Sequence, residues 1–123
     1  MTEIATPRRN IIAEQVVGRR LSAVTFVLDY IQLQFDPPPI LNALTPVRVV
    51  CGGRSARFGD ELFRNLICEQ IPKTIKSVSL VDEQSLRLIL DDDSEIAISL
   101  RREDYRGPEA VVLYGTNHVC VVI

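Results

Sequence analysis

Residues 86–91, LRLILD, and residues 31–36, IQLQFD, share one pattern of alternating side chains. Side chains alternate between the two faces of an extended chain, so Leu86, Leu88 and Leu90 fall on the same face. The second stretch has the same spacing of apolar residues. Alternation of this kind is typical of antiparallel strands that are buried on one side. The two stretches therefore predict two half-buried antiparallel strands.

Both predicted strands belong to longer segments that match each other. Before the strands the apolar residues match at an offset of 54: Val17, Leu21, Val24 and Phe26 correspond to Ile71, Ile75, Val78 and Leu80. Within the strands the offset is 55, and Ile31, Leu33 and Phe35 correspond to Leu86, Leu88 and Leu90. After the strands it is 56, and Ile40 and Leu44 correspond to Ile96 and Leu100. The offset changes between predicted strands, where a hairpin turn absorbs an insertion. One interpretation is an internal duplication of a helix plus a β-meander, with halves 10–51 and 60–100. The other interpretation is that the matches reflect only the alternation of apolar residues that any pair of strands shares.

Helical spacing appears between the two halves. In residues 58–71 the apolar residues recur every three or four positions, Asp60 suits the N-cap, and Pro72 ends the pattern. This predicts one firm helix near 60–70, and residues 10–17 predict a shorter one. Residues 110–123 predict a last hairpin, and Pro46 interrupts the apolar run 40–50.

The length of 123 residues suits a single domain, 1–123. The predicted fold class is α+β, with a mostly antiparallel curved sheet or open barrel of about six to eight strands. The meanders are expected to superpose, with Phe26 and Leu33 buried at positions equivalent to Leu80 and Leu88.

Composition excludes several classes of protein. The net charge is −2 and the fourteen basic residues form no stripe, so nucleic-acid binding is not expected. The apolar runs are too short to cross a membrane, and residues 1–10 lack the apolar core of a secretory signal. Cys51, Cys68 and Cys120 form no CxxC pair, which suits free thiols in a reducing compartment. The predicted location is the cytoplasm.

Residues 101–109 are the first candidate for a functional patch, since binding residues gather on loops held by rigid scaffolds. The candidate binding residues there are Arg101, Arg102, Tyr105, Arg106 and Glu109. The alternative is a solvated connection in which arginines and acids pair locally.

Three further groups have a functional and a structural interpretation. Arg54 and Arg57 lie in the glycine-rich stretch 51–59 and predict either an anion site or a flexible connection. His118 is either a catalytic or binding residue beside Cys120 or part of a turn. The acidic run Asp91, Asp92, Asp93 and Glu95 is either a cation site or a solvated hairpin turn. No metal or cofactor is predicted.

The segments 17–21, VGRRL, and 33–36, LQFD, with their counterparts from Lys73-Thr74-Ile75 to Asp91-Asp92-Asp93-Ser94, resemble a repeated pattern in a group of small bacterial β-rich proteins. That pattern is Gly-Lys-x-Val followed by Leu-x-Phe-Asp-Asp-Gly. Some members of such groups are similar to immunity proteins of contact-dependent toxin systems. The resemblance implies a binding role and no catalytic residue.

Two functional hypotheses follow. The first is a non-enzymatic protein that recognises another protein through arginine-rich loops. The alternative is a small-ligand sensor or enzyme with a pocket near Tyr105, Arg106, Glu109 and His118. A homodimer is also expected, because residues 119–123 form an apolar strand without charged gatekeepers and because Val27 and Ile89 face outward.

Overall fold

The computed structural model describes residues 7–36 and 38–123, so residues 1–6 and 37 of the predicted domain lie outside the description. The helices and strands, in chain order, are α1 (Arg8–Val16), β1 (Arg20–Val27), β2 (Tyr30–Asp36), β3 (Ile40–Ala43), β4 (Val47–Cys51), β5 (Arg54–Arg57), α2 (Phe63–Cys68), β6 (Ile75–Val81), β7 (Ser85–Leu90), β8 (Glu95–Ser99), the 3-10 turn η1 (Arg102–Asp104), β9 (Val111–Tyr114) and β10 (Cys120–Val122).

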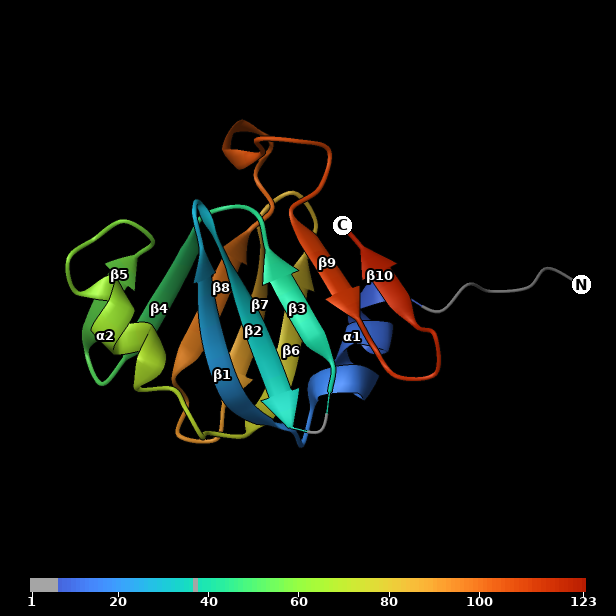
Figure 1. The fold of residues 1–123 in the computed structure, drawn as a ribbon, viewed down its shortest axis with the longest axis horizontal. Coiled ribbons are helices and arrows are strands. Elements are labelled where there is room, and N and C mark those ends of the chain that lie inside the picture. The colour runs from blue at the N-terminus through green and yellow to red at the C-terminus, as the bar shows by residue number, and fades with distance from the viewer. Residues whose placement is uncertain (1–6, 37) are drawn as a thin grey trace, which may run out of the picture.

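The strands form two antiparallel sheets that face each other (Figure 1). One sheet has the order β1-β2-β3-β9-β10 and the other β5-β4-β8-β7-β6. The α+β class with antiparallel strands is confirmed. The predicted single curved sheet or open barrel is wrong, since the described residues form two five-stranded sheets and neither closes into a barrel.

Each sheet combines a three-strand meander from one half of the chain with a hairpin from the other half. The meander β1-β2-β3 is extended by β9-β10, and the meander β6-β7-β8 is extended by β4-β5. Pro46 explains the first crossing, because it interrupts the strand pattern and lets the chain leave one sheet after β3 and enter the other at β4. This break and the unexpected strand β5 raise the strand count above the predicted six to eight.

The registers of the two meanders correspond. Leu33 pairs with Leu41 in one, and Leu88 pairs with Ile96 in the other, so the offset stays at 55 in the third strand and the predicted shift to 56 is wrong. The predicted one-residue difference does fall in a turn, because β1 and β2 are joined by two residues and β6 and β7 by three. The meanders share one topology, whereas a common origin by duplication stays a prediction.

The alternating apolar residues of both meanders fill the space between the sheets. Leu33 and Leu88 are fully buried, as predicted. Phe26 is not: its side chain is 40% exposed at the edge strand β1, and its ring packs edge-to-face against Phe63 with a centroid distance of 6.3 Å. An edge position leaves a large ring without a neighbour on one side.

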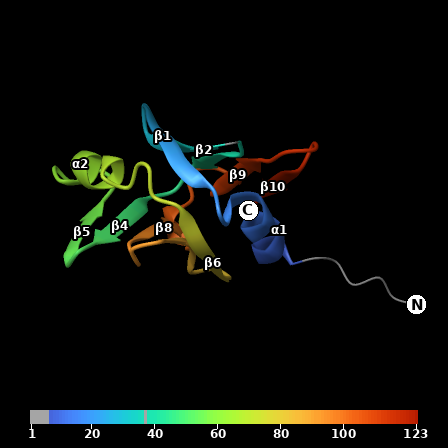
Figure 2. The same ribbon diagram turned by 90° about the horizontal axis from the view of Figure 1, so that it is seen from below.

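The two helices close the open sides of the sandwich (Figure 2). Helix α1 packs on β6 and β10, and α2 packs on β4, β5 and β1, so each helix bridges edges of the two sheets. Helix α2 lies within the predicted range 60–70 but has only six residues, and α1, which was predicted to be the shorter helix, is longer with nine. Asp60 does not cap α2, because its carboxylate accepts a hydrogen bond from the Arg57 N–H (2.8 Å) and Leu62 occupies the N-cap position.

Candidate functional site

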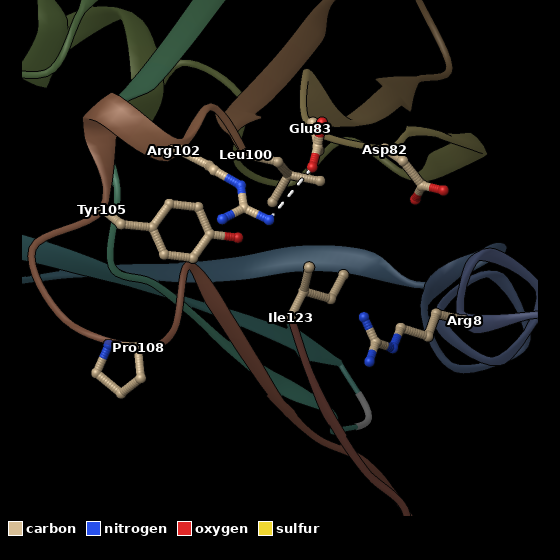
Figure 3. Close-up of a pocket in the computed structure, with 8 residues that line it drawn as sticks. All are labelled: Arg8, Asp82, Glu83, Leu100, Arg102, Tyr105, Pro108 and Ile123. Carbon is tan, nitrogen blue, oxygen red and sulfur yellow. Dashed lines mark hydrogen bonds and ion pairs between the residues drawn. The ribbon is translucent and has the colours of Figure 1, made fainter.

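A hollow of about 840 Å³ lies at one end of the sandwich, beside residues 101–109 (Figure 3). We call it the loop hollow. It is lined by Arg8, Asp82, Glu83, Leu100, Arg102, Tyr105, Pro108 and Ile123. These residues come from the start of α1, the β6–β7 turn, the loop after β8 and the strand end after β10. Four segments far apart in the sequence therefore meet at this hollow.

The floor of the loop hollow is apolar. Leu100 is only 4% exposed, and Tyr105 and Ile123 are partly buried against the hydrophobic core. Figure 3 shows these three side chains at the hollow, with Leu100 and Tyr105 coming from the loop after β8 and Ile123 from the residue after β10. Within the described part of the chain the Tyr105 hydroxyl has no hydrogen-bond partner, so its O–H is available to a ligand.

The rim of the loop hollow carries charges of both signs. The Arg102 guanidinium lies 3.5 Å from the Glu83 carboxylate, and both side chains are largely exposed. Arg8 points toward Ile123 from the side of α1 (Figure 3). An exposed ion pair is worth about 0 to 1 kcal/mol, so Arg102 can exchange Glu83 for an acidic group of a ligand at little cost.

Local hydrogen bonds hold the 101–109 loop in place. The Arg101 N–H donates to the Ser99 Oγ (3.2 Å), and the Ser99 hydroxyl bonds to the Asp104 carboxylate (2.5 Å). The Tyr105 N–H closes the 3-10 turn by donating to the Arg102 carbonyl (3.2 Å). These contacts tie the loop to the end of β8, and they fix the direction in which Tyr105 leaves the backbone.

The same loop borders two smaller hollows. One, of about 250 Å³, is lined partly by Arg101 and Asp104 on the outer face of the sheet that contains β8. The other, of about 180 Å³, is lined partly by Arg106 and Glu109, and there Arg106 forms an ion pair with Asp29 at 2.7 Å. Five predicted binding residues of this loop thus divide among three neighbouring hollows, with Arg102 and Tyr105 in the largest.

The remaining predicted site residues lie apart from the loop hollow. His118 is exposed in the β9–β10 turn, at the opposite end of the sandwich (Figure 1). The structure therefore does not bring it into one pocket with Tyr105, Arg106 and Glu109. His118 and the preceding Asn117 have positive φ angles of 62° and 55°, which is the backbone geometry of a turn.

Arg54 and Arg57 lie on opposite faces of β5, because side chains alternate along a strand and the buried Ala56 shares its face with Arg54. The Arg54 guanidinium makes two bonds to the Glu69 carboxylate of α2, at 2.8 and 3.1 Å, and the pairing raises the pKa of Arg54 and lowers that of Glu69. Arg57 lies instead in the 250 Å³ hollow with Arg101. The two arginines do not form one anion site.

The acidic run 91–95 is paired with basic residues. Lys73 Nζ lies 2.6 Å from the Asp92 carboxylate, and its hydrogen bond holds the pKa of Asp92 well below the usual range.

Lys73 Nζ also lies 3.6 Å from the Sγ of the buried Cys51. Hydrogen bonds from Ser94 and Gln70, together with the Lys73 charge, lower the pKa of Cys51 despite its burial. In the part of the chain that the structure describes, no group of three or more His, Cys, Asp or Glu residues could hold a metal ion.

Five of the lining residues lie outside the predicted patch 101–109: Arg8, Asp82, Glu83, Leu100 and Ile123. One signal could have found some of them. Successive turns of an antiparallel meander lie at alternate ends of the sheet, so the β6–β7 turn and the loop after β8 must share an end. The contributions of α1 and of Ile123 depend on the packing of the second sheet and leave no local signal.

Comparison with known proteins adds no relative to this geometry. Protein-family models, curated protein sequences and solved structures all give no significant match. No helix within the described residues is both long and apolar enough to cross a membrane.

Proposed function

We propose that this protein recognises another protein by binding an exposed segment of it in the loop hollow. The observation that carries the proposal is the combination of an apolar floor, formed by Leu100, Tyr105 and Ile123, with a rim of exchangeable charges. Protein interfaces have this composition, with an apolar centre, a polar rim and enrichment in tyrosine and arginine.

The floor favours an apolar anchor residue. Burying one leucine- or phenylalanine-sized side chain contributes about 1.5 to 3 kcal/mol relative to leaving it in water. Tyr105 adds a hydroxyl that can bond to the backbone of the bound segment. Leu100 follows directly after β8, so the floor is held by the sheet.

The rim favours an acidic residue beside that anchor. Arg8 forms no ion pair within the described residues, and Arg102 is held only by its exposed contact with Glu83. Arginine binds carboxylates through two parallel hydrogen bonds, which fix orientation as well as charge. The proposed ligand is therefore a segment with an apolar anchor and a neighbouring Asp or Glu.

The predicted cellular location, non-enzymatic role and homodimer are part of the same proposal. The three cysteines are free thiols, which supports the predicted reducing cytoplasmic compartment. A non-enzymatic and immunity-like role agrees with a binding site of this composition. The predicted homodimer is supported by β10, which is an edge strand, and by the exposed Tyr114 and Val122 beside that edge.

A displayed library of random peptides, selected on the immobilised protein, tests the proposal. The selected peptides are expected to share an apolar residue next to Asp or Glu, and to lose at least tenfold in affinity for Tyr105→Ala and for Arg102→Ala. Tyr30→Ala is the matched control, since Tyr30 borders the smallest hollow and not the loop hollow. Peptides that bind the Tyr105 and Arg102 variants as tightly as the wild type would place the binding site elsewhere.

A small-ligand sensor is the second candidate, because a volume of about 840 Å³ lies within the range of small-molecule pockets, ~300 to 1,000 Å³. A fragment screen by ligand-observed NMR separates the two candidates. Fragments that bind the wild type but not the Tyr105→Ala variant would favour the sensor, provided that the library selection yields no binding peptide.

A further inference from the structure

The outer face of the sheet β5-β4-β8-β7-β6 gathers arginines that are separate in the sequence. Arg48 pairs with Arg57 across β4 and β5, and on its other side it faces Ala97 of β8. Arg87 of β7 faces Ala97 from the far side. One cross-strand row therefore reads Arg57, Arg48, Ala97, Arg87, and Arg101 lines the same hollow. We call these four arginines the arginine face.

Two members of the arginine face make no direct ion pair, although the carboxylates of Glu95 and Asp104 line the same hollow. Arg48 and Arg57 are exposed and directly opposite each other, and neither forms an ion pair within the described residues. Like charges that face each other across two strands destabilise a sheet. A bound anion would remove this repulsion, which is an energetic reason to expect one here.

The hollow over Ala97 gives an anion room to approach. It has a volume of about 250 Å³, and its lining includes the small side chains of Ser85, Ala97 and Ser99. Arg87 is held only by a long contact of 3.6 Å with Glu95. Arg48 and Arg87 can therefore both turn toward a group bound above Ala97.

The length of the row decides what kind of anion fits. Adjacent strands are about 4.8 Å apart, so the three steps from Arg57 to Arg87 span roughly 14 Å. A single phosphate or carboxylate cannot reach both ends. In an extended peptide, alternate side chains lie on one face about 6.7 Å apart, so three acidic residues at alternate positions cover roughly 13 Å.

The surroundings favour a peptide over a nucleic acid. Glu95 and Asp104 line the same hollow, and their carboxylates oppose an acidic peptide and a phosphate backbone alike. The lining residues that are described include no aromatic ring on which bases could stack.

We propose that the arginine face binds an extended acidic segment of a partner protein, with alternate Asp or Glu side chains laid across the row from Arg57 to Arg87. This surface is separate from the loop hollow, except that the 101–109 loop contributes Arg101 to it. The tests below use Arg48 and Arg87, which take no part in the loop hollow, so the two proposals can fail independently.

Fluorescence anisotropy with the full chain and a labelled peptide of alternating Asp and Ser tests the proposal. Saturable binding is expected, weakened at 500 mM salt and absent for the same peptide with Asn in place of Asp. Arg48→Gln and Arg87→Gln are each expected to weaken binding about 2- to 5-fold. Arg64→Gln, an exposed arginine of α2 outside this hollow, is the matched control and is expected to change it less than about 1.5-fold.

Three results with the peptides would overturn the proposal: no saturable binding up to about 1 mM peptide, equal binding of the Asp and Asn peptides, or an equal loss with Arg64→Gln. A labelled single-stranded oligonucleotide is measured in parallel. Tighter binding of the oligonucleotide than of the acidic peptide, lost in the Arg48 and Arg87 variants, would also overturn it and assign the face to nucleic acid. Unchanged denaturation midpoints of the variants show that any loss of binding is not a loss of folding.

Discussion

Replacing Leu66 by alanine is expected to lower the free energy of unfolding by about 2 to 5 kcal/mol. Leu66 is fully buried on α2, where that helix closes the side of the sandwich between β5 and β1. Removing its side chain leaves a cavity between two sheets and a helix whose positions are fixed by many other contacts. The site cannot collapse easily, so the loss includes a cavity term as well as the lost burial.

The matched control is Asn65→Ala on the same helix. Asn65 is exposed, and its contribution to α2 is the carbonyl that accepts the Glu69 N–H (3.0 Å), which alanine retains. The expected change is below about 0.5 kcal/mol. The difference between the two variants therefore reports side-chain burial and not helix formation.

Urea denaturation and thermal unfolding, both followed by circular dichroism, measure the stability of the two variants. For a chain of this length, each kcal/mol of lost stability corresponds to roughly 4 °C in Tm, so Leu66→Ala is expected to melt about 8 to 20 °C lower than the wild type. Equal midpoints for Leu66→Ala and Asn65→Ala would refute the assignment of the buried face of α2.

The remaining predictions concern association, pH and thiol chemistry. Light scattering at micromolar concentration is expected to give a dimer mass for the wild type and a monomer mass for Val122→Lys at the β10 edge; a monomeric wild type contradicts the dimer. The Lys73 hydrogen bond lowers the folded-state pKa of Asp92, so the wild type is expected to be more stable than Asp92→Asn above about pH 4. This difference in the free energy of unfolding is expected to shrink as the pH falls through the lowered pKa. Urea titrations that show a difference growing toward acid pH would contradict the prediction. Iodoacetamide is expected to modify the two exposed cysteines before the buried Cys51, as read by mass spectrometry; first reaction at Cys51 would mean that its lowered pKa outweighs its burial.

Local patterns in the sequence were enough to predict the individual strands. The alternation in 31–36 and 86–91 identified β2 and β7 and their buried faces, and the glycine-containing turn after Tyr114 identified the last hairpin. Pro46 was recognised as an interruption of the strand. Period-two alternation reports which face of a strand is buried, and that information is local.

The arrangement of those strands could not be predicted in the same way. Whether the chain after Pro46 stays in one sheet or crosses to the other depends on contacts with β8, which lies about fifty residues later in the chain. For the same reason the loop hollow was only partly predicted. Arg102 and Tyr105 were identified from their loop, while Arg8 and Ile123 reach the hollow through the packing of α1 and β10 against the two sheets.

The arginine face shows the same division. The sequence shows no basic stripe because Arg48, Arg57 and Arg87 are far apart along the chain, and only the pairing of β5, β4, β8 and β7 brings them into one row. Cross-strand neighbours are determined by register, which no single strand contains.

A ¹⁵N-labelled sample titrated with a library-selected peptide tests the central claim, recognition of a protein segment in the loop hollow, most directly. The amide resonances that shift are expected to cluster at residues 100–109, at Glu83 and at Ile123, and those of the β9–β10 turn around His118 are expected to stay unchanged. Shifts that cluster around His118, with those of Tyr105 and Arg102 unchanged, would contradict it.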